Sequence, residues 1–337
     1  MYSIVLEGKD KSFTCGADDS LLRAGLRAGL GLPYECNTGA CGTCKFQLLE
    51  GETEDLWPDA PGVTERDREK GRKLACQNRP LGDCRIKMSI DPACVPHIAP
   101  TRRMVRLMES RPLTHDMYEF RFQADGAAEF LPGQYALFQL PGVTGQRAYS
   151  MANLANEAGE WHFHIKNMPG GAGSRTLFEG GVAAGQEVEM DGPYGLAYLR
   201  ESERDIVCIA GGSGLSPMIS IARGVAADSR FADRRHHFFF GGREPRDICG
   251  EDILRELPGF GTRMSFHAAI SEPSVAPDAW SGHRGFIHEL AVETLPGELA
   301  DYEFYFAGPP AMAEAVQRSL MREHKVPFGQ LHFDRFF

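Results

Sequence analysis

Three observations predict a multidomain chain that consists of an α+β unit, an antiparallel β-barrel and an α/β unit with a parallel sheet. The chain has 337 residues, more than one hydrophobic core usually organises. The stretch DPACVPHIAP contains three prolines, lacks periodicity and is typical of a linker. After about residue 200, short alternating strands give way to apolar strands that alternate with helices. We therefore expect three domains, at residues 1–95, 101–199 and 203–337.

The first domain combines strands with one amphipathic helix. YSIVLEG, KFQLLEG and CRIKMSI read as strands, and DDSLLRAGLRAGL reads as a helix that Asp19 or Ser20 caps. The apolar stripe of this helix consists of Leu21, Leu22, Leu26 and Leu30. A stripe of this kind must be buried against a sheet, so the unit is expected to be α+β.

The second and third domains differ in the hydrophobic pattern of their predicted strands. MYEFRFQA, QYALFQLPG, RAYSMAN, EWHFHIKNM and EVEMDGPYG are short and separated by glycine and proline turns, which predicts an antiparallel barrel. DIVCIAGG, RHHFFFGG, RMSFHAAISE and EFYFAGPP are nearly continuous apolar runs with helical segments between them. Such runs predict a parallel sheet that helices cover on both faces.

The net charge and the hydropathy of the chain argue against nucleic acid and membranes as partners. The formal net charge of −10 disfavours nucleic acid, because affinity for phosphate backbones comes from clustered lysine and arginine. No apolar run approaches the roughly 18 residues that a spanning helix needs, which argues against a membrane partner. The N-terminus alternates like a strand and does not resemble a signal peptide. We expect a cytoplasmic monomer whose partners are small molecules or proteins.

Four cysteines form the strongest motif of the chain. Cys36, Cys41 and Cys44 stand as C-x4-C-x2-C, and Cys76 follows about thirty residues later. This is the plant-type spacing for a [2Fe-2S] cluster. The loop between them is built from small residues that let backbone N–H groups approach the sulfurs. A structural zinc site is the alternative, but it usually needs a second C-x2-C or a histidine pair, and neither occurs near Cys76.

Two further segments suggest phosphate binding. RAYSMAN ends a strand with Arg147, Tyr149 and Ser150 in close order, and PGGAGS is a glycine-rich turn whose N–H groups could bind a diphosphate. Residue types alone are equally consistent with an arginine at the barrel edge and a tyrosine in the core. CIAGGSGLSPMIS reads as strand, glycine turn and helix start, a geometry that favours anions. By itself it is weak, because any tight strand-to-helix junction favours glycine.

The order of these motifs resembles the ferredoxin–NADP reductase superfamily, specifically its iron–sulfur flavoprotein oxygenase reductases. The resemblance covers nearly the whole chain and implies a β-grasp ferredoxin domain, a FAD-binding barrel and a NAD-binding α/β domain. It implies that Arg147 binds the flavin diphosphate, Tyr149 packs on the isoalloxazine and Ser150 reaches the flavin N5 region. Gly171 and Ser174 match the second FAD diphosphate motif. The positions that match the nicotinamide motifs are Gly211, Gly212, Gly214, Pro217, Gly308 and Pro309.

Three details qualify the resemblance. The family usually has cysteine before G-P-P, whereas this chain has Ala307, so we expect slower hydride transfer or weaker nicotinamide positioning. GGREPRD carries Glu244 beside Arg243, which favours NADH over NADPH because a 2′-phosphate favours arginine without a nearby acid. The C-terminal Phe336 or Phe337 is expected to gate the flavin, by resemblance, although composition alone favours a core plug.

The segments DLWPDAPG and HFDRFF resemble the reductase components of toluene and alkene multicomponent monooxygenases. The resemblance implies electron transfer from NADH through FAD and a [2Fe-2S] cluster to a Rieske ferredoxin or a diiron hydroxylase. The same module serving a Rieske-type aromatic dioxygenase is the closest alternative. A zinc-stapled protein that only senses nucleotide is an alternative of a different class.

Overall fold

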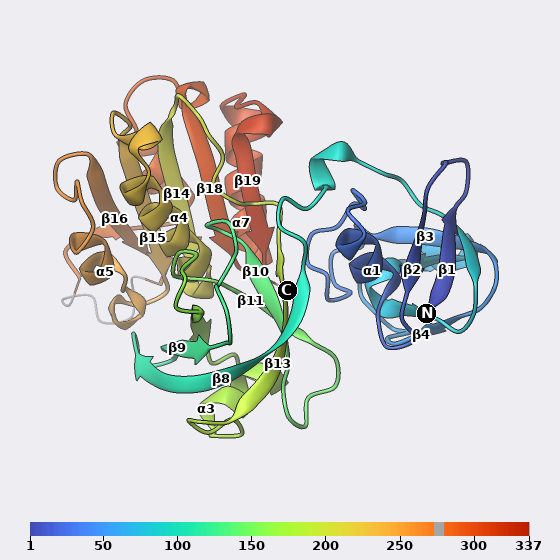
Figure 1. Cartoon of the computed structure of the whole chain (residues 1–337). Helices are drawn as coiled ribbons and strands as arrows, with labels where there is room; N and C mark the ends of the chain where they lie inside the picture. The colour runs from blue at the N-terminus through green and yellow to red at the C-terminus, as the bar shows by residue number, and fades with distance from the viewer. Residues whose placement is uncertain (273–279, 337) are drawn as a thin grey trace.

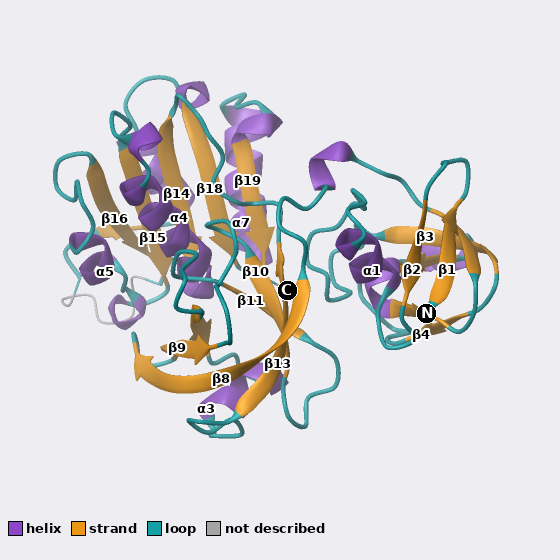
Figure 2. Cartoon of the chain, viewed as in Figure 1, coloured by secondary structure: helices purple, strands orange, loops and turns teal. Residues whose placement is uncertain are grey.

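The computed structural model describes residues 1–272 and 280–336, in which the chain forms three main sheets (Figure 1). The N-terminal part, blue in Figure 1, is a separate unit beside a larger body that contains the other two sheets. Helices flank the third sheet, whereas the barrel and the N-terminal unit consist mainly of strands and loops (Figure 2). The predicted order of an α+β unit, a barrel and an α/β unit is confirmed.

The first sheet is mixed and has the strand order β2-β1-β7-β3-β5. Its strands are β1 (Tyr2–Leu6), β2 (Ser12–Cys15), β3 (Lys45–Glu50), β5 (Arg72–Leu74) and β7 (Cys84–Lys87). Helix α1 (Leu21–Arg27) starts at Ser20, whose hydroxyl accepts a hydrogen bond from the Arg23 N–H at 3.3 Å. The helix ends earlier than the leucine pattern predicts, because Gly29 adopts a positive φ of 75°.

A small hairpin extends the N-terminal unit. Strands β4 (Thr53–Asp55) and β6 (Asn78–Pro80) pair antiparallel, and helix α2 (Glu65–Glu69) lies between them in the sequence. The ladder continues one step beyond the strands, where the Leu56 N–H donates to the Gln77 carbonyl at 2.8 Å. The hairpin therefore holds the segment after β4 beside the segment before β6.

The second sheet is an antiparallel barrel with the order β11-β10-β13-β8-β9-β12. Its strands are β8 (Thr101–Pro112), β9 (Met117–Gln123), β10 (Tyr135–Gln139), β11 (Arg147–Ser150), β12 (Glu160–Lys166) and β13 (Glu187–Tyr194). A bridge between Met151, which follows β11, and Phe163 in the middle of β12 joins these two strands, which would otherwise be edge strands. Helix α3 (Ala172–Phe178) follows β12.

The third sheet is parallel throughout, with the order β17-β16-β15-β14-β18-β19. Its strands are β14 (Asp205–Gly211), β15 (His236–Gly242), β16 (Met264–Ile270), β17 (His283–Arg284), β18 (Tyr302–Gly308) and β19 (Leu331–Arg335). Its helices are α4 (Leu215–Ala227), α5 (Glu251–Arg255), α6 (Ile287–Thr294) and α7 (Pro310–Arg318).

Helices cover both faces of this sheet. Cys208 and Ala210 of β14 belong to the core that includes α4 and α5, whereas Val207 and Ile209 belong to the core that includes α6 and α7. This double burial explains why the strands are nearly continuous apolar runs. Strand β19 is not predicted from the sequence, in which the C-terminal residues read as a tail.

None of the helices in residues 1–272 and 280–336 combines the length and the apolar character that crossing a bilayer requires.

Candidate functional site

The four predicted cysteines lie in one region of the N-terminal unit and are paired. The thiols of Cys36 and Cys41 lie close enough to shift each other's pKa, and so do the thiols of Cys44 and Cys76. Cys44 directly precedes β3, and Cys76 lies in a 3-10 turn (Ala75–Gln77) that follows β5. The Ala75 N–H donates to the Cys44 carbonyl at 2.9 Å, which fixes the second pair. Two pairs of sulfur donors fit the ligand set of a [2Fe-2S] cluster.

Backbone N–H groups point at the sulfurs, as the small residues of the loop predict. The Cys41 N–H lies 3.3 Å from Cys36 Sγ, and the Thr38 N–H lies 3.5 Å from the same atom. Gly39 allows this path because its φ is +99°, a conformation that favours glycine. A Cβ on Gly62 would lie 2.6 Å from the Gly39 carbonyl oxygen, so the neighbouring segment also needs glycine.

One thiol of each pair is predisposed to ionise. The hydrogen bond from Cys41 lowers the pKa of Cys36 to about 5, with help from the Thr38 and Cys41 N–H groups. In the second pair, the hydrogen bond from Cys76 lowers the pKa of Cys44. The donating thiols, Cys41 and Cys76, have raised pKa values because each faces the charge of its partner and is buried. Because the thiolate is the form that binds metal, these pairs favour ligation.

The predicted flavin residues meet at one end of the barrel. Arg147 and Tyr149 lie on β11, and the first turn of α3 packs against both. A Cβ on Gly173 would lie 2.7 Å from Arg147 Cγ and 2.8 Å from the Tyr149 hydroxyl oxygen, so glycine is required there. The structure thus brings RAYS and PGGAGS together. Within the second segment, the Ser174 hydroxyl donates to the Gly171 carbonyl at 3.2 Å.

Ser150 lies where the barrel meets the third sheet. Its side chain is buried, and its carbonyl accepts a hydrogen bond from the Ser216 hydroxyl of α4 at 2.6 Å. The same hydroxyl accepts from the His164 N–H of β12 at 3.0 Å. Ser216 therefore ties the end of β11 to the start of the helix that follows the glycine turn.

The predicted nicotinamide positions converge at the carboxyl ends of β14 and β18. Ala210 of β14 pairs with Ala307 of β18, so the glycine turn after β14 faces the G-P-P segment. A Cβ on Gly214 would lie 1.9 Å from the Ala307 carbonyl oxygen, and one on Gly308 would lie 2.9 Å from the Gly211 carbonyl oxygen. Gly212 and Pro309 belong to the same two turns, and Pro217 is buried in the first turn of α4. This edge is where open parallel sheets bind ligands.

The C-terminal aromatic segment reaches the same edge. The Phe336 N–H donates to the Gly308 carbonyl at 3.0 Å, and the Phe336 ring packs against the core that contains Leu215 and Ala307. Phe337, which the sequence analysis also proposed as a gate, lies outside the described residues.

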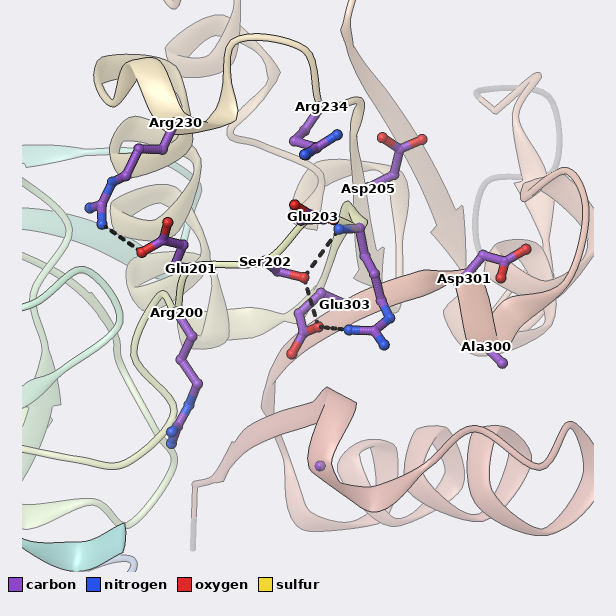
Figure 3. A pocket seen from close by; sticks show the side chains of 12 residues that line it. Arg200, Glu201, Ser202, Glu203, Asp205, Arg230, Arg234, Ala300, Asp301 and Glu303 are labelled. Atoms are coloured by element: carbon purple, nitrogen blue, oxygen red, sulfur yellow. Dashed lines mark hydrogen bonds and ion pairs between the residues drawn. The ribbon is translucent and has the colours of Figure 1, made fainter.

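A surface hollow of about 1070 Å³ lies elsewhere on the third sheet (Figure 3). It is lined by residues such as Asp205 and Asp301, at the amino ends of β14 and β18 and therefore opposite the glycine turns. Its four arginines face five carboxylates, and pairs such as Arg204 with Glu303 at 3.4 Å are joined across it. This balance of charge gives it no preference for an anionic nucleotide.

Comparison with known proteins bears on all three units. Residues 4–81 match the family model of a 2Fe-2S iron-sulfur cluster binding domain, residues 104–198 that of an oxidoreductase FAD-binding domain, and residues 208–318 that of an oxidoreductase NAD-binding domain. Over its full length the chain is 44% identical to the ferredoxin–NAD(P)(+) reductase CarAd of Metapseudomonas resinovorans, with 100% of each chain covered. The chain belongs to the iron–sulfur flavoprotein reductases of the ferredoxin–NADP reductase superfamily.

Other relatives of this reductase agree. It is 38% identical to the ferredoxin–NAD(+) reductase component of the alkene monooxygenase system of Xanthobacter autotrophicus, over 97% of this chain and 98% of the relative. The solved structure of a ferredoxin reductase in carbazole 1,9a-dioxygenase superposes with a TM-score of 0.90 at 39% identity, covering 100% of this chain and 98% of the other. The predicted FAD, [2Fe-2S] and nicotinamide cofactors are therefore confirmed for the domains, and the protein is an oxidoreductase.

The cysteine loop of the reductase is docked directly onto the barrel. The Tyr135 hydroxyl of β10 donates to the Glu35 carbonyl at 2.6 Å, and the Tyr34 hydroxyl accepts from the Gly195 N–H at 3.0 Å. Arg335, the last residue of β19, binds the Glu35 carboxylate through two nitrogens, at 2.9 and 2.7 Å. The residue next to Cys36 is thus held by both the barrel and the third sheet.

A second set of charges lies along the same boundary. Arg27 of α1 forms an ion pair with Asp191 of β13, whose side chain is fully buried. Arg102 of β8 binds Asp18 and Asp19, which precede α1. Because breaking a buried pair leaves an uncompensated charge, these contacts fix the orientation of the ferredoxin domain.

Asp334 also lies at this boundary, and its carboxyl group destabilises the folded state when it is ionised. Burial, together with the charges of Glu35 and Cys36, raises its pKa to about 7. One of its oxygens has no hydrogen-bond partner among the described residues. A carboxyl whose pKa is higher in the folded state binds more protons there than in the unfolded state. Its contribution to stability is therefore lost as the pH rises from about 4 to 7.

We expect Asp334→Asn to make the reductase more stable at high pH. Its advantage in free energy of unfolding should be larger at pH 8 than at pH 5 by on the order of 3 kcal/mol, because one pKa unit corresponds to about 1.4 kcal/mol. Thermal unfolding at both pH values measures this difference. Asp125→Asn, at an exposed position, is the control. An equal shift of Asp334→Asn at both pH values would contradict the buried titration.

Sequence reasoning missed the residues of this boundary. Tyr135, Arg27 and Arg335 are ordinary members of strands and a helix, and their partners are distant in the sequence. The only available signal was polar residues in otherwise apolar surroundings, such as Asp191 in EVEMDGPYG, since buried charges need partners.

Proposed function

We propose that this reductase takes electrons from NADH and delivers them to a Rieske ferredoxin or a diiron hydroxylase of a toluene- or alkene-type monooxygenase. When bound, FAD accepts two electrons from the nicotinamide nucleotide and the [2Fe-2S] cluster passes them on singly. One NADH thus reduces two molecules of a one-electron acceptor and yields NAD+ and one proton. The observation that carries this order is the contact between the cysteine loop and the barrel at Tyr135 and Glu35.

The residue roles are those that the family resemblance implies, and the positions described above support them. Cys36, Cys41, Cys44 and Cys76 would ligate the cluster. Arg147, with Gly171 and Ser174 on the adjacent turn, would hold the FAD diphosphate, while Tyr149 would pack on the ring system and Ser150 would lie near its reactive edge. Gly211, Gly212, Gly214, Pro217, Gly308 and Pro309 would surround the nicotinamide nucleotide, and Phe336 or Phe337 would shield the flavin face. The corresponding domains are residues 1–95, 101–199 and 203–337.

The preference for NADH rests on the segment after β15. Arg243 and Glu244 follow this strand directly, next to the strand that carries the glycine turn. Glu244 binds Arg246 at 2.8 Å, and Arg243 lies 3.8 Å from Glu272. Carboxylates near these arginines oppose a 2′-phosphate and suit a ribose hydroxyl. We propose that kcat/KM is higher for NADH than for NADPH.

Arg147→Ala tests the flavin assignment. We expect FAD to bind about 10- to 150-fold more weakly, because a hydrogen bond to a charged group contributes about 1.5–3 kcal/mol. Titration of the apoprotein with FAD, followed by flavin fluorescence, measures the loss. The cluster content should stay unchanged. Arg106→Ala, which removes an exposed arginine of the same barrel, is the matched control. Equal FAD affinity in wild type and Arg147→Ala would refute the assignment.

A Rieske-type aromatic dioxygenase is the second candidate system. It is favoured by the similarity to a structure described as a ferredoxin reductase in carbazole 1,9a-dioxygenase. Mixing the reductase with each terminal oxygenase, NADH and substrate distinguishes the two, because only the cognate system couples NADH oxidation to product. We further propose that the reductase works as a cytoplasmic monomer. The metal-type spacing of its cysteines is consistent with a reducing compartment.

A further inference from the structure

A stretch of exposed side chains lies next to the cysteine loop, on residues that the proposed electron path does not use. Residues Leu56–Asp59 follow β4, and all four are exposed. Leu56 is 44% exposed and Trp57 is 43% exposed, although both are large apolar side chains. We refer to residues 56–59 as the exit patch. Figure 1 shows β4 in the ferredoxin domain, set apart from the barrel strands β10 and β13.

Trp57 touches the cysteine loop itself. A Cβ on Gly39 would lie 2.9 Å from Trp57 Cε3, so the indole ring packs on the glycine between Cys36 and Cys41. Leu56 is also close to a cysteine, because its N–H donates to the carbonyl of Gln77, the residue after Cys76. The exit patch therefore contacts both segments that carry the cysteine quartet.

The patch and the barrel approach different parts of the loop. Glu35, which precedes Cys36, is held by Tyr135 and Arg335, whereas Trp57 covers Gly39. Electrons that reach the cluster from the barrel side would thus leave past Leu56 and Trp57, which are 44% and 43% exposed.

The segment that carries the patch is acidic in sequence, although Arg79 binds Glu54, Arg85 binds Glu50, and Arg68 donates to the Pro58 carbonyl of the patch at 2.6 Å. Residues 46–65 contain six carboxylates and no lysine, arginine or histidine. Asp55 accepts a hydrogen bond from the Trp57 N–H at 3.1 Å, and Asp59 is exposed within the patch. An apolar centre with a charged rim is the composition of a protein interface, and tryptophan is enriched among residues that dominate binding energy.

We propose that the exit patch is the docking surface for the electron acceptor, a one-electron carrier protein that presents a basic rim around an apolar centre. The proposal rests on the proposed function. Trp57 and Leu56 supply the desolvated centre, while Asp55 and Asp59 attract the partner over a longer range and speed its encounter.

Cytochrome c, a basic one-electron carrier, is the probe. In NADH-dependent reduction by the full-length holoprotein, Trp57→Ala should raise the KM for cytochrome c about 10- to 30-fold, the size of effect of an interface hot spot. Trp57→Phe should restore most of the affinity. Asp59→Lys should raise the same KM and weaken its dependence on salt, because rim charges act on encounter. Ferricyanide reduction and the KM for NADH should not change.

Phe328→Ala, which truncates a 60% exposed aromatic side chain on the third domain, is the matched control and should leave the KM for cytochrome c unchanged. Since Trp57 packs on the cysteine loop, the visible and paramagnetic spectra of each variant are compared with those of wild type. If Trp57→Ala loses its cluster, Asp59→Lys and Asp59→Asn decide the question. An unchanged KM in the variants that retain the cluster overturns the proposal, and so does a wild-type dimer that Trp57→Ala converts to monomer. A wild-type protein that carries no flavin or does not oxidise NADH would instead refute the proposed function.

Discussion

Replacing Cys76 with alanine is expected to abolish electron delivery to an acceptor protein while leaving NADH-dependent ferricyanide reduction largely intact. Cys76 is fully buried and is the only member of the quartet outside the loop of residues 36–44. Loss of residues that merely support a metal ligand costs about 10- to 100-fold in activity, so loss of a ligand should exceed about 100-fold. The flavin residues lie in another domain, so they should still bind FAD.

The measurement compares two acceptors for one protein sample. Cytochrome c reports transfer through the cluster, and ferricyanide reports reduction of the flavin. Cys84→Ala is the matched control, because Cys84 is buried in the same domain but belongs to β7 and lies outside the quartet. It should retain both activities. If Cys76→Ala also lost the ferricyanide activity with FAD still bound, the order of transfer from flavin to cluster would be wrong.

Gly214→Ala should remove the use of NADH almost completely. The added Cβ would lie 1.9 Å from the Ala307 carbonyl oxygen and 2.4 Å from its carbon, and both are backbone atoms. They cannot move aside, because β18 is paired with β14 and β19 on its two sides. Gly214 has a helical φ of −58°, so the effect comes from the contact and not from the backbone conformation.

We expect kcat/KM for NADH to fall at least about 100-fold and the domain to lose about 1–3 kcal/mol of stability, the usual cost of overpacking. Steady-state ferricyanide reduction and thermal unfolding measure the two effects. Gly329→Ala serves as the control, because a Cβ there would meet no atom within 4 Å and the residue belongs to the same domain. Wild-type kinetics in Gly214→Ala would mean that the turn after β14 does not bind the nucleotide.

Much of the fold and the composition of the site could be predicted from local sequence. The cysteine spacing, the alternating barrel strands and the glycine turns all encode short-range geometry that residue types report directly. The contact of Gly173 with Arg147 could not be read from the sequence, but both segments were proposed for the same ligand, and the structure places them together.

The parts that could not be predicted depend on tertiary pairing. The terminus HFDRFF has too few residues to show a period, and it forms β19 only because β18 offers a free edge. The raised pKa of Asp334 likewise depends on the burial of one face of that strand between two domains. Contacts of this kind join residues up to 300 positions apart, such as Arg335 and Glu35, so no local sequence pattern predicts them.

The boundary charges have a consequence for engineered chimaeras. Exchanging residues 1–95 for another electron-carrier domain would preserve the order of the domains and the linker. It would, however, remove Arg27, the partner of the buried Asp191, and Glu35, the partner of Arg335. Swapped modules should therefore couple poorly unless the incoming one carries an arginine and a glutamate at the matching places. The exchange of domains is therefore limited by a few complementary side chains at the boundary and not by the linker between the domains.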